Sequence, residues 1–399
     1  MTNKPQFVGE KVKLGELLLD TFSGEWGTEK GESLIPVLRT SNFNEDGSFD
    51  YSTPAMRCIP ERKVTKKRMV RGDIILEKSG GTPKRPVGIM AFYDSDALAL
   101  CSNFNQVLRF DADRILPKFA FHQLRWLKDR NAFYRYTRKT TGLQNLQMNK
   151  LVELKLCVPQ IEIQTSIAAT LDEIVGNQRA LQQGIAGFDS LAKSRFVEMF
   201  GGLSGYESRA LEGCVSVIES GKSPKCLAKP REGDDPGVLR LSAISSGVYK
   251  EAENKALPSG AKVTDGKMVR DGDILLARKN TPELVGQSVL VNHTDGNIMF
   301  PDIVFRMRSR PEVDEVYLSH VLAHPLAGAI KSLAHGSAKS MSNIPKSKLA
   351  KLLIPLPPLA FQQEFAAFAS QVDKSRFIAR QQIEKLQMLY DKLAQDYFG

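Results

Sequence analysis

Apolar residues recur every three and four positions along two long stretches of the chain, 161–202 and 359–399. This spacing predicts a long helix with a coiled-coil seam in each stretch. The register of the first stretch reappears in the second, so the two seams can bury each other if the helices pair antiparallel. Two helices buried separately in their own domains are the alternative. The residues expected in the helix pairing are Ile167, Leu171, Ile174, Leu181, Ile185, Phe188, Phe365, Val372, Ala379, Ile383, Leu386 and Leu393.

Shorter apolar runs repeat in the same order before each long stretch. A Gly-Asp turn followed by a β-branched run at 72–76 recurs at 271–276, and predicts a buried strand in each half. A second strand at 107–110 matches 304–307, and helix candidates follow at 117–127 and 317–326. The predicted fold class is therefore α+β, with two tandem mixed α/β globules that are each followed by a long helix. The expected boundaries are 1–160, 161–202, 203–358 and 359–399.

The amino-acid composition indicates which kind of partner the chain binds and in which cellular compartment it lies. A chain of 399 residues with a formal net charge of +10 favours a polyanionic partner, nucleic acid more than membrane. No apolar run is long enough to span a bilayer, and the N-terminus lacks the apolar core of a signal peptide. The five cysteines are scattered and form no C-x-x-C pair, which fits a reducing cytoplasm without a disulfide framework or zinc site.

Several catalytic signatures are missing from the sequence. It contains no phosphate-binding G-x-x-x-x-G-K-[ST] loop and no Gly-rich fingerprint for a dinucleotide or adenosyl cofactor. The [DNS]-P-P-[YFW] tetrapeptide of amino-methyltransferases is also missing. His320 and His324 have the spacing of a metal pair, but they lack a glutamate between them and a third ligand, so we expect a structural role. The chain is therefore interpreted as a binder without catalytic residues, metal or cofactor of its own.

The distribution of basic residues favours DNA binding. They gather at 57–71 and at 125–139, where aromatic residues separate them, and again at 306–310 and 331–351. Lysine and arginine neutralise phosphates without regard to sequence, whereas base readout needs polar side chains on loops that reach base edges. The candidates in the first half are Arg39, Thr40, Ser41, Asn42, Lys78, Ser79, Thr82, Lys84, Lys139, Thr141 and Asn145. Those in the second half are Arg240, Ser242, Arg278, Lys279, Asn280, Lys339, Ser340 and Asn343.

The two halves differ most in their loops. Residues 78–85 and 278–284 have unlike sequences, although the framework around them repeats. A duplicated scaffold with two loop sets suits two different recognition tasks.

With these motifs in place, the whole chain resembles the specificity subunit of type I restriction–modification enzymes. The resemblance rests on the repeated G-D-I-[IL] at 72–75 and 272–275, and on the segments before each long helix, 142–164 and 340–362. The second segment contains I-P-L-P-P-L-x-x-Q at 354–362, as is usual in that family. The first segment departs from this form, because Pro159 stands alone where the family has two prolines.

The resemblance implies a mechanism for the chain. Each globule would be a target recognition domain that reads one half of a bipartite site in double-stranded DNA, and the paired helices would hold the two domains at a fixed separation. Two methyltransferase subunits that bind S-adenosylmethionine would methylate adenine N6, and restriction/motor subunits that use ATP and Mg would join them for cleavage. A self-sufficient DNA-modifying enzyme and a non-enzymatic coiled-coil scaffold remain as alternatives. The missing cofactor motifs argue against the first, and the duplicated globules with different loops argue against the second.

Overall fold

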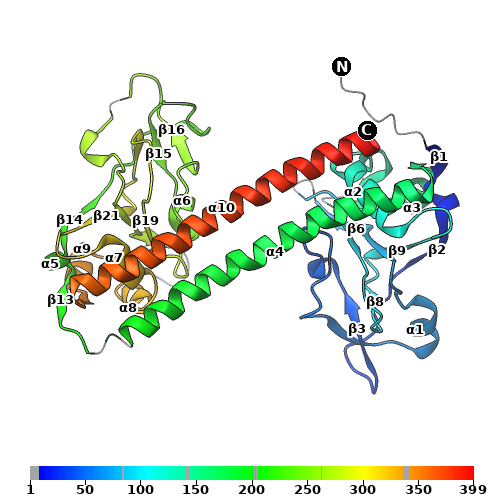
Figure 1. The fold of residues 1–399 in the computed structure, drawn as a ribbon, viewed down its shortest axis with the longest axis horizontal. Coiled ribbons are helices and arrows are strands. Elements are labelled where there is room, and N and C mark those ends of the chain that lie inside the picture. The colour runs from blue at the N-terminus through cyan, green and yellow to red at the C-terminus, as the bar shows by residue number, and fades with distance from the viewer. Residues whose placement is uncertain are drawn as a thin grey trace. The chain divides into compact units, whose positions relative to one another are not determined.

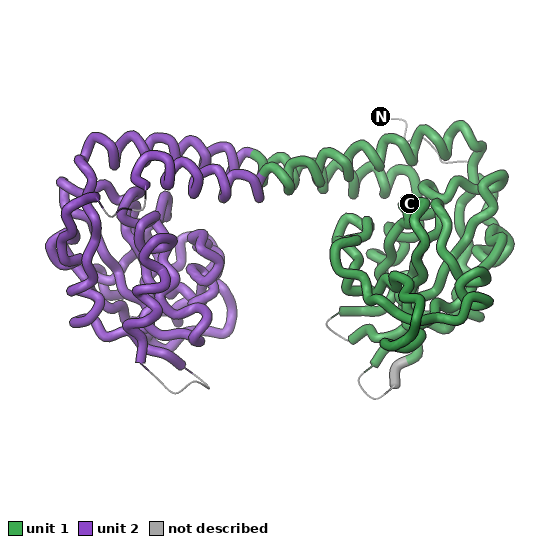
Figure 2. Tube along the Cα trace, turned by 90° about the horizontal axis from the view of Figure 1, so that it is seen from below, with its two compact units in different colours: residues 1–184, 379–399 green, residues 185–378 purple. Residues whose placement is uncertain are grey.

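The computed structural model describes residues 9–82, 85–140, 143–201, 203, 205–261, 263–335 and 341–399. The chain divides into two compact units, which are coloured separately in Figure 2. Unit 1 comprises residues 1–184 and 379–399, and unit 2 comprises residues 185–378. No helix in the described part of the chain is both long enough and apolar enough to cross a membrane.

Unit 1 is built on a four-stranded antiparallel sheet in the order β2-β9-β5-β7. Unit 1 also contains two three-stranded sheets, β4-β3-β8 and β10-β11-β6, and the strand pair β1-β12. Its strands are β1 (Glu10–Lys13), β2 (Leu18–Ser23), β3 (Leu34–Leu38), β4 (Ala55–Cys58), β5 (Ile74–Glu77), β6 (Ser79–Gly81), β7 (Met90–Phe92), β8 (Leu100–Cys101), β9 (Asn105–Phe110), β10 (Thr137–Thr140), β11 (Leu143–Leu146) and β12 (Lys155–Val158). Its shorter helices are η1 (Leu14–Leu17), η2 (Thr40–Asn42), α1 (Glu61–Lys67), α2 (Pro117–Asp129), η3 (Tyr134–Tyr136) and α3 (Met148–Leu151).

Among its described residues, unit 2 repeats this arrangement except that a two-stranded sheet, β18-β22, stands where unit 1 has β10-β11-β6. Its four-stranded sheet has the order β14-β21-β17-β19, beside the sheets β16-β15-β20, β18-β22 and β13-β23. Its strands are β13 (Ser208–Ala210), β14 (Val215–Ser220), β15 (Gly237–Leu239), β16 (Asn254–Ala256), β17 (Ile274–Ala277), β18 (Lys279–Asn280), β19 (Ser288–Leu290), β20 (Ile298–Met299), β21 (Val304–Ser309), β22 (Ser342–Asn343) and β23 (Leu353–Pro355). Its shorter helices are α5 (Leu211–Cys214), α6 (Ser242–Ser245), η4 (Asp265–Lys267), α7 (Glu315–Ala323), α8 (Ala327–Ser332) and α9 (Lys346–Ala350).

Strand pairing corrects one detail of the predicted repeat. Ile74 faces Leu108 across β5 and β9, whereas Ile274 faces Met307 across β17 and β21. The counterpart of Arg109 is therefore Arg308, and the match of 107–110 with 304–307 was wrong by two residues. A shift of two residues leaves every side chain on the same face of a strand, so the alternating pattern alone could not reveal the error.

Local signals explain where the helix after β21 begins and ends. Asp314 caps α7, because its carboxylate accepts hydrogen bonds from the backbone N–H groups of Val316 (2.9 Å) and Tyr317 (3.0 Å). The helix ends at Ala323, since Pro325 disfavours a helical backbone at the residue before it. The prediction of 317–326 missed both signals, whereas Pro117 in the first turn fixes α2 where it was expected.

The long helices are α4 (Ile161–Phe200) and α10 (Leu359–Phe398), each of 40 residues, and Figure 1 shows them side by side. In unit 1, Leu171 near the start of α4 shares a core with Tyr390 and Phe398 near the end of α10. In unit 2, Phe196 near the end of α4 packs on Phe365 near the start of α10, with ring centroids 5.2 Å apart. The two helices therefore run antiparallel, and the predicted fold class is confirmed.

The predicted pairing residues lie along this seam. Six of them are buried: Ile167, Leu171, Ile174, Phe365, Val372 and Ala379. The others are half-buried: Leu181, Ile185, Phe188, Ile383, Leu386 and Leu393. Ile167, Leu171 and Ile174 also belong to the core of unit 1, and Phe365 belongs to the core of unit 2.

Candidate nucleic-acid interface

The Gly-Asp turn in each unit sets the start of the strand that leads into the candidate loops. Gly72 and Gly272 have φ angles of +96° and +80°, which a side chain would strain. The next residue, Asp73 or Asp273, is fully buried and accepts a hydrogen bond from the backbone N–H of the residue three positions before it, at 2.8 and 2.9 Å. The repeated Gly-Asp motif therefore has a structural role, because it fixes the turn from which β5 and β17 begin.

The candidates at 39–42 form the turn after β3. Asn42 is buried, and its Oδ1 accepts a hydrogen bond from the Arg39 backbone N–H at 2.9 Å. Its Nδ2 donates to the carbonyl oxygens of Asp50 and Thr53, both at 3.2 Å. Asn42 thus holds the turn closed and has no exposed edge for DNA, whereas Ser41 beside it is exposed.

Two candidate segments far apart in the sequence lie next to each other in both units. In unit 1, Ser79 of β6 faces Asn145 of β11. In unit 2, Lys279 of β18 faces Asn343 of β22. The segment after the Gly-Asp strand and the segment before the long helix therefore form one small sheet, in which a serine in unit 1 and a lysine in unit 2 face the same type of residue, asparagine.

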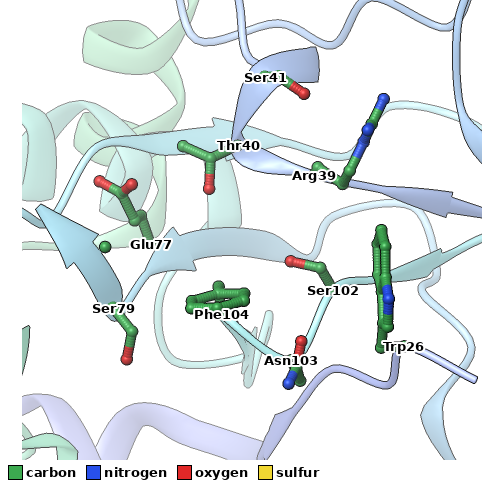
Figure 3. A pocket seen from close by; sticks show the side chains of 10 residues that line it. Trp26, Arg39, Thr40, Ser41, Glu77, Ser79, Ser102, Asn103 and Phe104 are labelled. Carbon is green, nitrogen blue, oxygen red and sulfur yellow. The ribbon is translucent and has the colours of Figure 1, made fainter.

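An open pocket of about 350 Å³ collects four of the candidates in unit 1 (Figure 3). Arg39, Thr40, Ser41 and Ser79 line it, together with residues that the sequence did not single out: Trp26, Glu77, Gly80, Ser102, Asn103 and Phe104. Phe104 is 54% exposed, which is unusual for a phenylalanine, but exposure is a property of the fold and leaves no mark in the sequence.

The lysine and arginine that follow the strand of the Gly-Asp motif are both half-buried. Lys78 donates hydrogen bonds from Nζ to Ser23 Oγ (2.6 Å) and Gln106 Oε1 (3.3 Å), and burial lowers its pKa. Arg278 lies with its guanidinium 5.2 Å from the ring centroid of Phe305. Both cations are held against the sheet by their own unit.

The unit 2 candidates are arranged around the turn after β15. Ser242 is exposed and donates a hydrogen bond to Glu253 Oε2 at 2.7 Å. Arg240 is half-buried and donates to the carbonyl oxygen of Ala228 at 3.4 Å. Asn280 is buried, and its Oδ1 accepts a hydrogen bond from the backbone N–H of Thr281 at 2.9 Å. Like Asn42, Asn280 has its side chain inside the unit.

Several candidates fall at the margins of the described chain. Lys84, Thr141, Lys339 and Ser340 lie outside the described residues. Lys139 belongs to β10 and pairs through its backbone with Gln144. Thr82 is exposed and forms a tight turn with Arg85, whose backbone N–H donates to Thr82 Oγ1 at 3.1 Å.

Many of the basic residues at 57–71 have acidic partners within unit 1. Arg57 pairs with Glu29 at 2.8 Å and lies over the Trp26 ring at 4.1 Å. Lys63 and Lys67 both reach Glu25 at 3.2 Å. Arg57, Lys67 and Glu25 are half-buried, so these pairs belong to the packing of unit 1, whereas Lys63 is exposed.

The histidine pair in unit 2 lies in an aromatic cluster. The His320 ring stacks on Phe196 with centroids 4.7 Å apart, and burial lowers its pKa to about 3. Its counterpart His122 in unit 1 is buried between Tyr390 Oη and Asp172 Oδ1, both at 2.9 Å. Among the described residues, no group of three or more His, Cys, Asp or Glu side chains is placed to hold a metal ion.

A glutamine in the first turn of each long helix has the same structural role in both units. Gln164 is buried, accepts a hydrogen bond from the Leu116 backbone N–H at 2.7 Å and donates to the Pro159 carbonyl at 2.8 Å. Gln362 does the same with Asp314 (3.0 Å) and Pro357 (2.7 Å). Each glutamine thus fastens the start of a long helix to the globule that precedes it.

Comparisons with known proteins agree with this architecture. Residues 22–186 match the family described as the type I restriction modification DNA specificity domain. The chain is 31% identical over 190 residues to the EcoEI specificity subunit of Escherichia coli, a match that covers 45% of this chain and 32% of that protein. It is 23% identical to the putative MjaX specificity subunit of Methanocaldococcus jannaschii, over 96% of this chain and 94% of that protein.

The chain is thus similar to specificity subunits of type I restriction enzymes. Among solved structures, the type I S subunit from M. genitalium has the same fold, with a TM-score of 0.61 at 14% identity over 100% of this chain and 98% of that one. A chain from a study of complex assembly and conformational transition in a type I R-M system gives a TM-score of 0.53 at 19% identity, over 100% and 99%. The matched residues 22–186 lie largely in unit 1, and unit 2 repeats the arrangement of its four-stranded sheet.

Proposed function

We propose that this chain is the DNA-binding specificity subunit of a type I restriction–modification complex. Each unit reads one half of a bipartite site in double-stranded DNA. The chain thereby directs adenine N6 methylation and ATP-dependent cleavage that partner subunits carry out. Those partners, and not this chain, bind S-adenosylmethionine, ATP and Mg.

The observation that carries the proposal is a repeated scaffold with different polar side chains at equivalent positions. Ser79 in unit 1 stands where unit 2 has Lys279, and each faces an asparagine, Asn145 or Asn343, on the same small sheet. Base edges in the major groove differ in their donors and acceptors, so two reading surfaces need different side chains on one framework. The net charge of +10 supplies sequence-independent attraction to phosphates.

Exchange of one unit tests the proposal. Residues 1–158 of a relative with another target would replace those of this chain, and methylation would be mapped in cells that express the partner subunits. We expect one half of the methylated motif to change and the other half to persist, because residues 203–358 are unchanged. A change in both halves would contradict independent reading.

Exposed apolar residues on the long helices support two equivalent docking sites. Ile163 and Leu191 of α4 are 43% and 48% exposed, and the corresponding residues of α10, Phe361 and Leu389, are 51% and 44% exposed. Apolar side chains repeated on the outer face of both helices are typical of a partner interface. We propose that two methyltransferase subunits bind here, one at each end of the helix pair, and that restriction/motor subunits join the assembled complex.

Substitution of an exposed leucine by aspartate tests whether two methyltransferase subunits bind. Leu191→Asp and Leu389→Asp should each reduce the bound methyltransferase subunits from two to one, and the double variant should bind neither. Mass photometry of the reconstituted complex gives the count. Gln381→Asp, an exposed change on α10, is the control and should leave two subunits bound.

A further inference from the structure

The pocket in unit 1 has two unlike sides (Figure 3). Trp26 and Phe104 offer aromatic surface, and Thr40 and Ser79 offer hydroxyl groups from the turn after β3 and from β6. Glu77, the last residue of β5, lines the same pocket and is 2% exposed. A buried carboxylate on the wall of an open pocket requires a physical reason.

The hydrogen bonds of this carboxylate are incomplete. Arg85 donates to Oε1 of Glu77. Oε2 is buried and has no hydrogen-bond partner among the described residues. An acceptor left in this state costs free energy, and buried polar atoms in folded proteins almost always have a partner. An external donor that enters the pocket would satisfy it.

The scaffold itself does not need an acid at this position. The equivalent residue at the end of β17 is Ala277, which is buried in the same strand pairing. Burial raises the pKa of Glu77 in spite of the nearby Arg85. A carboxyl group whose pKa is raised by folding stabilises the fold only below its unfolded pKa and loses that contribution as the pH rises, so at neutral pH Glu77 weakens the fold. Residues of this kind are retained for function more often than for stability.

A second buried polar group lies directly across the sheet. Asn105 of β9 is the register partner of Glu77 and is fully buried. Its Oδ1 accepts a hydrogen bond from Thr40 Oγ1 at 3.0 Å, and its Nδ2 has no partner among the described residues. Unit 2 has Val304 at this place, so both polar groups belong to unit 1 alone. Unit 1 therefore presents an acceptor beside a donor where unit 2 is apolar.

We infer that this pocket receives the edge of a DNA base that carries an exocyclic amino group, adenine or cytosine, and that Oε2 of Glu77 accepts a hydrogen bond from that group. The inference rests on the proposed function, in which unit 1 reads one half-site. Guanine O6 and thymine O4 are acceptors and would be repelled by the carboxylate, so Glu77 also excludes the wrong bases. Trp26 and Phe104 keep water from the contact.

The test uses the full chain assembled with its methyltransferase subunits and duplexes of its mapped recognition site. Each adenine or cytosine in the half-site of unit 1 is replaced in turn by an analogue that lacks the amino group, purine or 2-pyrimidinone. The wild-type complex should lose about tenfold or more in affinity at one position, as is usual for a base-specific contact. The analogue that produces the loss identifies the base as adenine or cytosine.

Two substitutions connect that position to Glu77. Glu77→Ala and the isosteric Glu77→Gln should lower affinity for the natural site by a similar factor, and the alanine variant should show no further loss with the analogue. Glu45→Gln, an exposed change in the same unit, should behave as wild type. Affinity changes caused by the other base pairs of the same half-site should be as in wild type, which reports that unit 1 of the variants is folded.

Several outcomes overturn the inference. It fails if no amino group in this half-site affects wild-type affinity, or if wild type and Glu77→Gln lose equally at the sensitive position. The scan with wild-type protein and the isosteric variant does not depend on the alanine variant folding. If wild type shows no preference for its mapped site over random DNA, the proposed function fails instead.

Discussion

Arg109 donates two parallel hydrogen bonds to Asp73, from Nε to Oδ1 and from a terminal nitrogen to Oδ2, each 2.8 Å long. In unit 2, Arg308 donates from Nε to Asp273 at 2.6 Å. Both aspartates are fully buried, and both belong to the Gly-Asp motif. The aspartate of the repeated motif is thus explained by a buried ion pair that joins the start of one strand to the neighbouring strand, and not by contact with DNA.

Asp73→Ala should therefore destabilise unit 1 strongly. The change leaves the Arg109 guanidinium without its buried partner and the Val70 backbone N–H without its acceptor, at a cost of roughly 2–4 kcal/mol. Urea-induced unfolding measures the loss. Arg71→Ala, which breaks exposed pairs with Asp94 and Asp96, should cost less than about 1 kcal/mol. Equal effects of the two changes would contradict a structural role for the buried pair.

Acid should weaken unit 2 through His320. Its pKa is about 6.5 in the unfolded chain and is lowered by burial to about 3 in the folded one. The unfolded state therefore binds a proton below pH 6.5 while the folded state does not, so stability is fully present above pH 6.5 and is lost as the pH falls towards 3. Between pH 6.5 and 5 this loss reaches at most about 1.6 kcal/mol.

His320→Phe keeps an aromatic ring on Phe196 and removes the titration. The difference in unfolding free energy between pH 6.5 and 5 should shrink in this variant by the amount above, as measured by chemical denaturation at the two pH values. An unchanged pH dependence in His320→Phe would show that His320 is protonated in the folded state.

Glycines in the middle of α4 should weaken the helix. An ideal Cβ at Gly184 or Gly187 would have no atom within 4 Å, and the corresponding positions of α10 carry Gln382 and Lys385. Gly184→Ala and Gly187→Ala should each stabilise the protein by up to about 1 kcal/mol, because glycine is the poorer helix former. Thermal unfolding measures the gain. Gly24→Ala is the opposite control, since its Cβ would lie 2.2 Å from the Cys101 carbonyl oxygen and must destabilise unit 1.

The sequence predicted those features that depend on periodicity within one segment. The seam from Ile167 to Leu393 was found because heptad spacing is local, and the repeat was found because both copies keep it. The burial of Asn42 could not be predicted, since it depends on hydrogen bonds to Asp50 and Thr53 in the turn that follows. The pocket was missed for a similar reason. Trp26, Glu77 and Phe104 come from three separated segments, and Glu77 has no acidic counterpart in the repeat, where Ala277 takes its place.

The last prediction concerns the length of the helix pair. Four residues inserted after Gly184 in α4 and four after Ile378 in α10 would lengthen both helices by about 6 Å at 1.5 Å per residue. Both insertions fall where the two units divide, so the seam contacts within each unit are kept. Four residues also come close to one helical turn of 3.6 residues, which nearly preserves rotational phase.

If the helices act as a ruler, the unspecified spacer of the methylated motif should grow by about two base pairs, at roughly 3.4 Å each. The bases at both ends should stay the same, because neither unit is altered. Methylome sequencing with wild-type and lengthened subunits gives both readings. Leu181→Asp with Ile185→Asp is the contrasting variant, since charges in the half-buried seam should separate the helices and abolish methylation. A spacer that keeps its length after the double insertion, with methylation intact, would show that the helices do not set the distance between the half-sites.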